Sequence, residues 1–184
     1  MDIYTHVRDA FYSGEHAFTG DRQVIKDISF LINEGYLNLQ LFPIASRQEH
    51  LTMMRDLEKK KKTKADEASG GSTEHIALKL LSGEYLQKKF GLKVLYEHPL
   101  CGYYPDIMTN DGRIVVECGH TNNPEKMLTY FKQGNIEECI LVPYPDPEKQ
   151  TVQAYSLIAL GELKNFLDFW ESEKRAELLK KLGR

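Results

Sequence analysis

The chain has 184 residues, of which 41% are hydrophobic and 28% are charged, and this composition is typical of a folded protein with a hydrophobic core. No stretch approaches the run of about 18 apolar residues that a membrane-spanning helix needs, so we expect no membrane association. The formal net charge of −3 excludes a strong overall attraction to nucleic acid. Any contact with phosphate groups must therefore come from a local patch or from bound cations.

The cysteines and the N-terminal segment favour a cytoplasmic protein. Cys101, Cys118 and Cys139 are odd in number and form no CxxC pair, which favours reduced thiols over disulfide bonds. The first residues, MDIYTHVRDAFYSGEH, are mixed and charged, and they lack the apolar centre of a signal peptide. We therefore expect a cytoplasmic localisation.

Residues 1–68 are expected to form a helical N-terminal extension. The segment 23–36 has apolar residues at helical spacing and ends at a glycine, which predicts a short helix. A second helical segment begins near Ser46 and runs into a strongly charged stretch that ends in Ser-Gly-Gly-Ser, a composition typical of a linker or loop. We therefore place a boundary near residue 68, and residues 69–184 form the core with a C-terminal helix.

The pattern after Ser72 predicts an α/β core. Ser72 or Thr73 is a suitable N-cap for a helix that Gly91 would end. The expected order is a helix (72–90), a strand (92–100), a hairpin (107–116), a helix (124–133), two strands (138–144 and 151–157) and one or two amphipathic helices from about residue 158. This order predicts a mixed β-sheet flanked by helices.

The hairpin carries two acidic residues, Asp106 and Glu117, beside residues that need burial. A two-residue type I′ turn at Asp111-Gly112 would place Asp106 directly opposite Glu117. Directly opposed residues have Cβ atoms roughly 4.5–5.5 Å apart, so the two carboxylates would repel each other unless one is protonated or a cation lies between them. A divalent cation such as Mg²⁺ prefers these oxygen ligands. Alternatively, a turn of different length would leave both acids in solvent at the strand ends.

Pro105-Asp106 followed after ten residues by Glu117 resembles the motif of the PD-(D/E)xK nuclease superfamily, which includes many restriction endonucleases and Holliday-junction resolvases. The order of elements over residues 72–157 is similar too, whereas the N-terminal part is unmatched. The resemblance implies a restriction-endonuclease-like core and a nuclease that acts on DNA with Mg²⁺, which Mn²⁺ can replace. It also implies that Asp106 and Glu117 hold the metal, with the backbone carbonyl of Cys118 as a further ligand.

The sequence departs from the family pattern at the lysine that normally follows the glutamate by two residues, because Gly119 occupies that position. His120 is a poor substitute, since alternation along a strand places it on the opposite face. Some relatives supply the lysine from the following helix, and a glycine would leave room for it. Lys126 is the first candidate and Lys132 the second. A lysine in the first turn opposes the helix dipole, so stability alone does not explain Lys126.

Two glutamates on the helix before the first strand could act as the additional metal or water ligand that the superfamily often has. Glu74 and Glu84 are ten residues apart and differ by about 80° around the helix, so we expect only one of them to face the site. We prefer Glu74, because the opening Ser-Thr-Glu-His resembles that of several relatives. Alternatively, Glu74 only favours the helix N-terminus, and Glu84 is a solvated acid.

Gly119 also leaves open a degenerate relative, which would bind nucleic acid or a protein partner without cleavage. A purely structural or interaction protein is a third possibility. Because such nucleases commonly cut both strands as dimers, a homodimer is a further expectation. The sequence does not distinguish DNA from RNA as the substrate.

Overall fold

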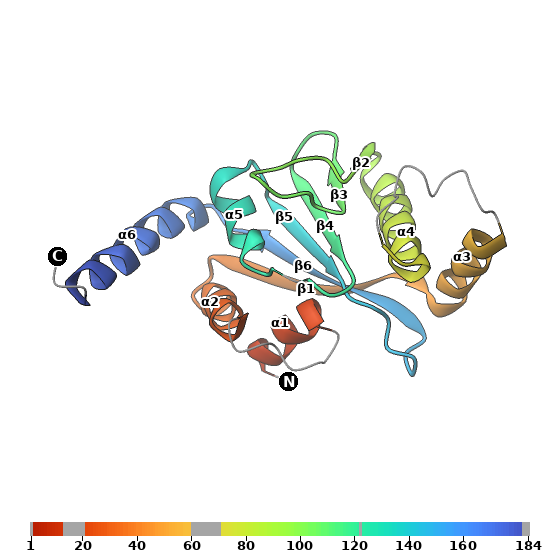
Figure 1. Cartoon of the computed structure of the whole chain (residues 1–184), viewed down its shortest axis with the longest axis horizontal. Helices are drawn as coiled ribbons and strands as arrows, with labels where there is room; N and C mark the ends of the chain where they lie inside the picture. Colours follow the sequence, from red (N-terminus) through yellow and green to blue (C-terminus); the bar gives the residue numbers. More distant parts are fainter. Residues whose placement is uncertain (1, 13–20, 60–70, 122, 182–184) are drawn as a thin grey trace.

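The protein is described here by a computed structural model, which covers residues 2–12, 21–59, 71–121 and 123–181 (Figure 1). Among these residues, six strands form one sheet in the order β1-β6-β5-β4-β3-β2. The strands are β1 (Leu37–Ser46), β2 (Val94–Tyr96), β3 (Ile107–Thr109), β4 (Ile114–Cys118), β5 (Glu138–Val142) and β6 (Thr151–Ala159). The helices are α1 (Ile3–Tyr12), α2 (Asp21–Asn33), α3 (Arg47–Lys59), α4 (Thr73–Phe90), α5 (Lys126–Gln133) and α6 (Leu163–Lys181).

The sheet is mixed. Strands β4 and β5 run parallel, whereas every other neighbouring pair is antiparallel. A parallel pair needs a crossover connection, and α5 lies within the segment that provides it. The prediction of an α/β fold with a mixed sheet flanked by helices is therefore confirmed.

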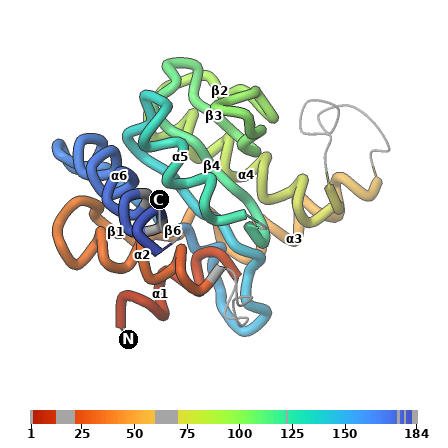
Figure 2. The backbone as a smooth tube through the Cα atoms, turned by 60° about the vertical axis from the view of Figure 1, so that its left-hand side comes forward, coloured from red at the N-terminus to blue at the C-terminus, as the bar shows by residue number. Residues whose placement is uncertain are grey.

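Helices cover both faces of the sheet (Figure 2). Val115 and Leu141 belong to a hydrophobic cluster with residues of α1, α2, α5 and the beginning of α6. Val116 and Val142 belong to a second cluster with residues of α4 on the opposite face. Beyond its first turns, α6 extends away from the sheet toward one end of the molecule (Figure 1). In the part of the chain that is described, no helix is long and apolar enough to cross a membrane.

The expectation that residues 1–68 are helical is wrong for one segment, because Leu37–Ser46 forms strand β1. This strand is antiparallel to β6 along its whole length, so the N-terminal segment contributes an edge strand to the same sheet as the core. The register shifts between Pro43 and Ala45. An edge position with a bulge is where a strand tolerates proline, which cannot donate a backbone hydrogen bond.

The predicted helix ends are largely confirmed. Ser72 caps α4, since its side chain accepts a hydrogen bond from the backbone of His75. Gly91 ends α4 in the left-handed conformation, with φ of 68°. Helix α5 begins at Lys126, two residues later than expected, and Gly134 ends it. The predicted linker that ends the N-terminal segment falls on residues 60–70, outside the described residues.

The hairpin has the predicted register but not the predicted turn. Ile107 pairs with Val116, and Met108 pairs with Val115. A type I′ turn needs positive φ at both central residues, whereas only Gly112 of the expected pair has it, with φ of 71°. The backbone of Gly112 donates instead to the carbonyl of Thr109, so the turn has two more residues between its strands. The longer turn preserves the strand pairing because one extra residue on each side of Asp111-Gly112 belongs to the turn instead of to a strand.

Candidate active site

Asp106 and Glu117 lie at the end of the hairpin, one position beyond the pair formed by Ile107 and Val116. Their side chains are only 14% and 5% exposed. The alternative in which both acids lie in solvent at the strand ends is therefore wrong. Each carboxylate has its own set of partners, and these partners come from opposite faces of the sheet.

Donors from α4 and β4 surround the carboxylate of Asp106. The backbone N–H of Cys118 donates to Oδ2 over 2.7 Å, and Nε2 of His75 lies 3.1 Å from Oδ1. The ammonium of Lys79 lies 3.4 Å from the same Oδ1. Burial opposes the ionised form, but the hydrogen bonds from His75 and Cys118 and the nearby positive charge hold the pKa of Asp106 below its ordinary value. Asp106 is thus an ionised carboxylate, and each of its oxygens has a donor within the protein.

Donors from α5 hold the carboxylate of Glu117. Lys126 donates to Oε2 over 2.5 Å, and the hydroxyl of Tyr130 donates to Oε1 over 3.0 Å. Burial raises the pKa of Glu117 to about 7, with the charge of Asp106 adding to the effect and Lys126 opposing it. Burial and the neighbouring Glu117 also raise the pKa of Tyr130, so its hydroxyl keeps its proton. Unlike Asp106, Glu117 has too little positive charge around it to be firmly ionised at neutral pH.

Lys126, which the sequence placed first among the candidates for the missing lysine, contacts Glu117 directly. Its side chain is 16% exposed, so it is not a solvated surface lysine. Lys132 points elsewhere and pairs with Glu171 and Asp168 of α6. The structure therefore brings Lys126, and not Lys132, to the carboxylate of Glu117.

Gly119 was expected to leave room for a lysine, but the ring of Tyr144 fills the space beside it. Gly119 has φ of +71°, and a Cβ added there would lie 2.7 Å from Cζ of Tyr144. The ring of Tyr144 packs in turn against His120, with ring centroids 5.1 Å apart. The glycine is therefore explained by its backbone conformation and by the tyrosine, and Lys126 reaches Glu117 without using this space.

Neither predicted helix glutamate reaches the carboxylates. Glu74 and Glu84 are half-buried on α4, and no hydrogen bond or ion pair joins either of them to Asp106 or Glu117. The charge of Glu74 acts instead on His50 of α3, whose pKa burial lowers. The residues of α4 that face Asp106 are His75 and Lys79, one helical turn apart.

Cys118 contributes its backbone rather than its thiol. The thiol lies on the α4 face, 3.8 Å from the hydroxyl of Ser82, and burial raises its pKa well above the ordinary value. An uncharged thiol is a poor metal ligand. The role of the Cys118 carbonyl as a ligand stays a prediction.

The sequence pattern did not single out His75, Lys79 and Tyr130, nor Glu97, which pairs with Lys79. His75, Lys79 and Ser82 are polar residues spaced along one face of a helix whose neighbours are apolar, and all three contact residues of the hairpin. Polar residues at this spacing on an otherwise apolar helix face indicate a helix face that contacts a polar site. Tyr130 lies one turn after Lys126 on α5, so a search for donors on the same helix face would have found it.

Carboxylate oxygens such as those of Asp106 and Glu117 are the ligands that a hard divalent cation prefers, and Glu117 is the acid with less positive charge around it. A carboxylate whose pKa rises to about 7 is short of positive charge, which a cation would supply. Each carboxylate oxygen can accept more than one contact, so the existing hydrogen bonds leave acceptor capacity. Among the described residues, no three His, Cys, Asp or Glu side chains gather as a metal cluster. Mg²⁺ commonly needs only one or two carboxylates, with water and substrate oxygens completing its coordination.

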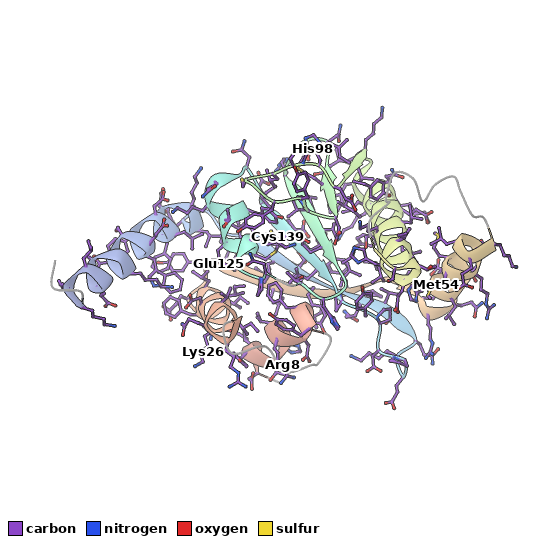
Figure 3. The ribbon with its side chains drawn as sticks, viewed as in Figure 1. Arg8, Lys26, Met54, His98, Glu125 and Cys139 are labelled. Atoms are coloured by element: carbon purple, nitrogen blue, oxygen red, sulfur yellow. The ribbon has the colours of Figure 1, made fainter. Side chains whose placement is uncertain are left out.

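Two cavities lie away from the carboxylates. One of about 110 Å³ is lined by Asp9 of α1 and by residues of the segment 143–155, including Tyr144. Another of about 210 Å³ lies among α2, α5 and α6 and includes Trp170. Asp106 and Glu117 line neither of them. Figure 3 labels Glu125, which directly precedes α5, and Cys139, which lies on strand β5.

Comparison with known proteins adds no relative. No protein-family model matches the chain, and neither a curated protein nor a solved structure gives a significant match. The motif and the geometry of the carboxylates and their partners are therefore the only indications of function in the described part of the chain.

Proposed function

We propose that this chain is a Mg²⁺-dependent nuclease that hydrolyses phosphodiester bonds in DNA, with a restriction-endonuclease-like core. The observation that carries the proposal is the contact between Lys126 and Glu117, next to Asp106 at the end of the same hairpin. A buried acid, a second acid one strand away and a lysine in hydrogen-bond reach are the groups that the resemblance requires. They come together here although the sequence lacks the lysine at its usual position.

The roles follow from the surroundings of each residue. Asp106 and Glu117 would hold the cation, with the Cys118 carbonyl as a further ligand. When bound, Mg²⁺ lowers the pKa of a water molecule and stabilises the charge on the scissile phosphate. Lys126 favours the ionised form of Glu117 and orients the attacking water, and Tyr130 fixes the other oxygen of Glu117. Glu74 has no role in this proposal, because the structure does not bring it to the carboxylates.

The test is a cleavage assay with Mg²⁺ or Mn²⁺ on duplex DNA, single-stranded DNA, branched DNA and RNA. We expect Asp106→Asn and Glu117→Gln each to lower the rate by on the order of 10²-fold or more, as losses of central catalytic groups do. Glu137→Gln is the matched control, because Glu137 is an exposed acid that pairs with Arg113 outside the site. If both site variants cleave DNA as fast as wild type, the assignment is wrong.

A second candidate is a non-cleaving protein that uses the same fold to bind nucleic acid or a protein partner. It is favoured by one observation, namely that each of the four carboxylate oxygens already has a partner within the protein. Titration calorimetry separates the two candidates. The nuclease takes up Mg²⁺ in a way that Glu117→Gln abolishes, whereas the non-cleaving protein takes up little Mg²⁺ in either form.

A homodimer remains part of the proposal, because cutting both strands of a duplex calls for two sites. Sedimentation equilibrium with and without a DNA duplex measures it directly. A chain that stays monomeric at all concentrations on the duplex would act on one strand at a time.

A further inference from the structure

Lys79 lies between two carboxylates on the α4 side of the site. Its ammonium is 2.5 Å from Oε1 of Glu97 and 3.4 Å from Oδ1 of Asp106. The side chain of Lys79 is 1% exposed, whereas that of Glu97 is 38% exposed. A buried ammonium in contact with two acids occupies the kind of position in which a metal ion binds carboxylate oxygens.

The backbone around Glu97 is held in an unusual conformation that supports this contact. Glu97 has φ of 50°, a value that non-glycine residues rarely adopt. Its N–H donates to the backbone carbonyl of Asp106 over 3.2 Å, and this bond ties the loop after β2 to the start of β3. Unfavourable backbone conformations persist where the surrounding structure enforces them. With its backbone in this conformation, Glu97 has its carboxylate in contact with the ammonium of Lys79.

The charges of the site favour a single divalent cation. Asp106, Glu97 and Glu117 supply three negative charges when ionised, and Lys79 and Lys126 supply two positive charges. One divalent cation therefore leaves one positive charge among these side chains and the cation. That remainder matches the single negative charge of a phosphodiester, whereas a second cation would leave three positive charges in a partly buried site.

We infer that the ammonium of Lys79 stands in place of a second divalent cation, so that the site binds one metal ion, on the Glu117 side. This inference rests on the proposed metal-dependent nuclease. Lys79 is a positioning residue in this scheme: it orients Asp106 and neutralises the α4 side, and it does not touch the substrate. His75 holds the same oxygen of Asp106 and completes the arrangement.

The first measurement is the number of Mn²⁺ ions bound by the wild-type chain, by electron paramagnetic resonance of free Mn²⁺ during a titration. We expect one ion per chain. Glu117→Gln should weaken its binding at least tenfold. Two ions per wild-type chain would overturn the inference while leaving the proposed nuclease intact. No ion bound at millimolar Mn²⁺ would overturn the proposed function itself.

The second measurement uses Lys79→Ala, which leaves Glu97 and Asp106 facing a gap without the ammonium. We expect this variant to bind a second Mn²⁺ and to gain more thermal stability from Mn²⁺ than wild type does. Lys174→Ala is the control, because Lys174 pairs with Asp27 over 2.7 Å outside the site and its removal should leave the count at one.

Lys79→Ala removes the ammonium that contacts Asp106 and Glu97, and Lys79→Ala with Glu97→Gln covers the case in which the single variant does not fold. The double variant keeps only Asp106 on that side, so we expect it to fold and to bind one ion several-fold more tightly than wild type. If Lys79→Ala, or the double variant in its place, binds the same number of ions with unchanged affinity, Lys79 has only a structural role.

Discussion

Lys126 donates a hydrogen bond to Glu117 from the first residue of α5, nine positions further along the chain. Asp106 lies beside the same strand end, but its side-chain partners come from α4. The pKa values of the two acids of one hairpin are therefore shifted in opposite directions. The pKa of Asp106 is lowered, whereas burial raises that of Glu117 to about 7. Glu117 is the carboxylate whose charge depends on what binds next to it.

The raised pKa of Glu117 predicts that stability falls between pH 4.5 and about 7. In this window the folded state keeps a proton that the unfolded chain has lost, so rising pH favours unfolding. The shift from 4.5 to about 7 corresponds to at most about 3 kcal/mol. Glu117→Gln cannot ionise, so we expect its free energy of unfolding to vary less with pH than that of wild type. Urea unfolding at pH 5 and pH 8 without divalent ions measures the difference.

Asp106 acts in a separate pH window. Its pKa is lowered, so its contribution to stability is present above pH 3.8 and is lost as the pH falls below that value.

The control for the Glu117 prediction is Glu137→Gln, which changes an exposed acid. The free energy of unfolding of this variant should vary with pH between 5 and 8 as that of wild type does. A Glu117→Gln variant with the same slope as wild type would contradict the raised pKa.

Lys126→Met should separate metal binding from cleavage. Removing a positive charge next to Glu117 strengthens its attraction for a divalent cation, so we expect Mn²⁺ to bind several-fold more tightly. Cleavage should slow on the order of 10²-fold, because the water loses the group that orients it. The matched control is Lys132→Met on the same helix, whose partners are the exposed acids of α6 and whose loss should change neither quantity. Parallel losses of binding and cleavage in Lys126→Met would indicate a structural lysine instead.

The sequence could predict most helices and the core strands because their apolar residues recur at the spacing of each element. Strand β1 was missed although Leu37, Leu39 and Leu41 alternate with polar residues. The signal is weak in physical terms, since an edge strand is only half-buried and Pro43 argues against a strand. The nearby helices then led the whole N-terminal segment to be interpreted as helical.

The candidate site was predictable only in part. The register of the hairpin was predicted from a turn centred on Asp111-Gly112, and the longer observed turn has the same centre, so Asp106 and Glu117 could be placed together. The partners of Asp106 could not be predicted in the same way. His75 lies 31 residues earlier in the chain, and which face of α4 meets the sheet depends on tertiary packing. Glu74 was chosen by resemblance, but the adjacent residue faces the site.

Gly119→Lys, which restores the lysine of the family pattern, should not replace Lys126. The new side chain would begin 2.7 Å from the ring of Tyr144, in a backbone conformation with φ of +71°. The backbone alone should cost about 1–2 kcal/mol for a residue with a Cβ. We expect a lower melting temperature and no recovery of cleavage when Gly119→Lys is added to Lys126→Met. Recovery of cleavage in the double variant would show that the usual lysine position remains open.

The close approach of α4 to β2 depends on Gly83, and this contact sets the position of Lys79 one turn earlier. A Cβ at Gly83 would lie 2.4 Å from the hydroxyl of Tyr96, whereas the next nearest atom, Cζ of the same ring, is 3.3 Å away. Gly83→Ala should therefore lower the free energy of unfolding by roughly 1 kcal/mol or more, despite the higher helix propensity of alanine.

Removing the hydroxyl of Tyr96 should relieve that contact. In a double-mutant cycle, we expect Gly83→Ala to destabilise the Tyr96→Phe background clearly less than it destabilises wild type. Urea unfolding of the four proteins gives the coupling free energy. If Gly83→Ala lowers the free energy of unfolding equally in both backgrounds, the added methyl group does not press on the hydroxyl of Tyr96. In that case α4, rather than the ring, has moved to make room. The same variants should then show a changed affinity for Mn²⁺, because a shift of α4 moves Lys79 relative to Asp106.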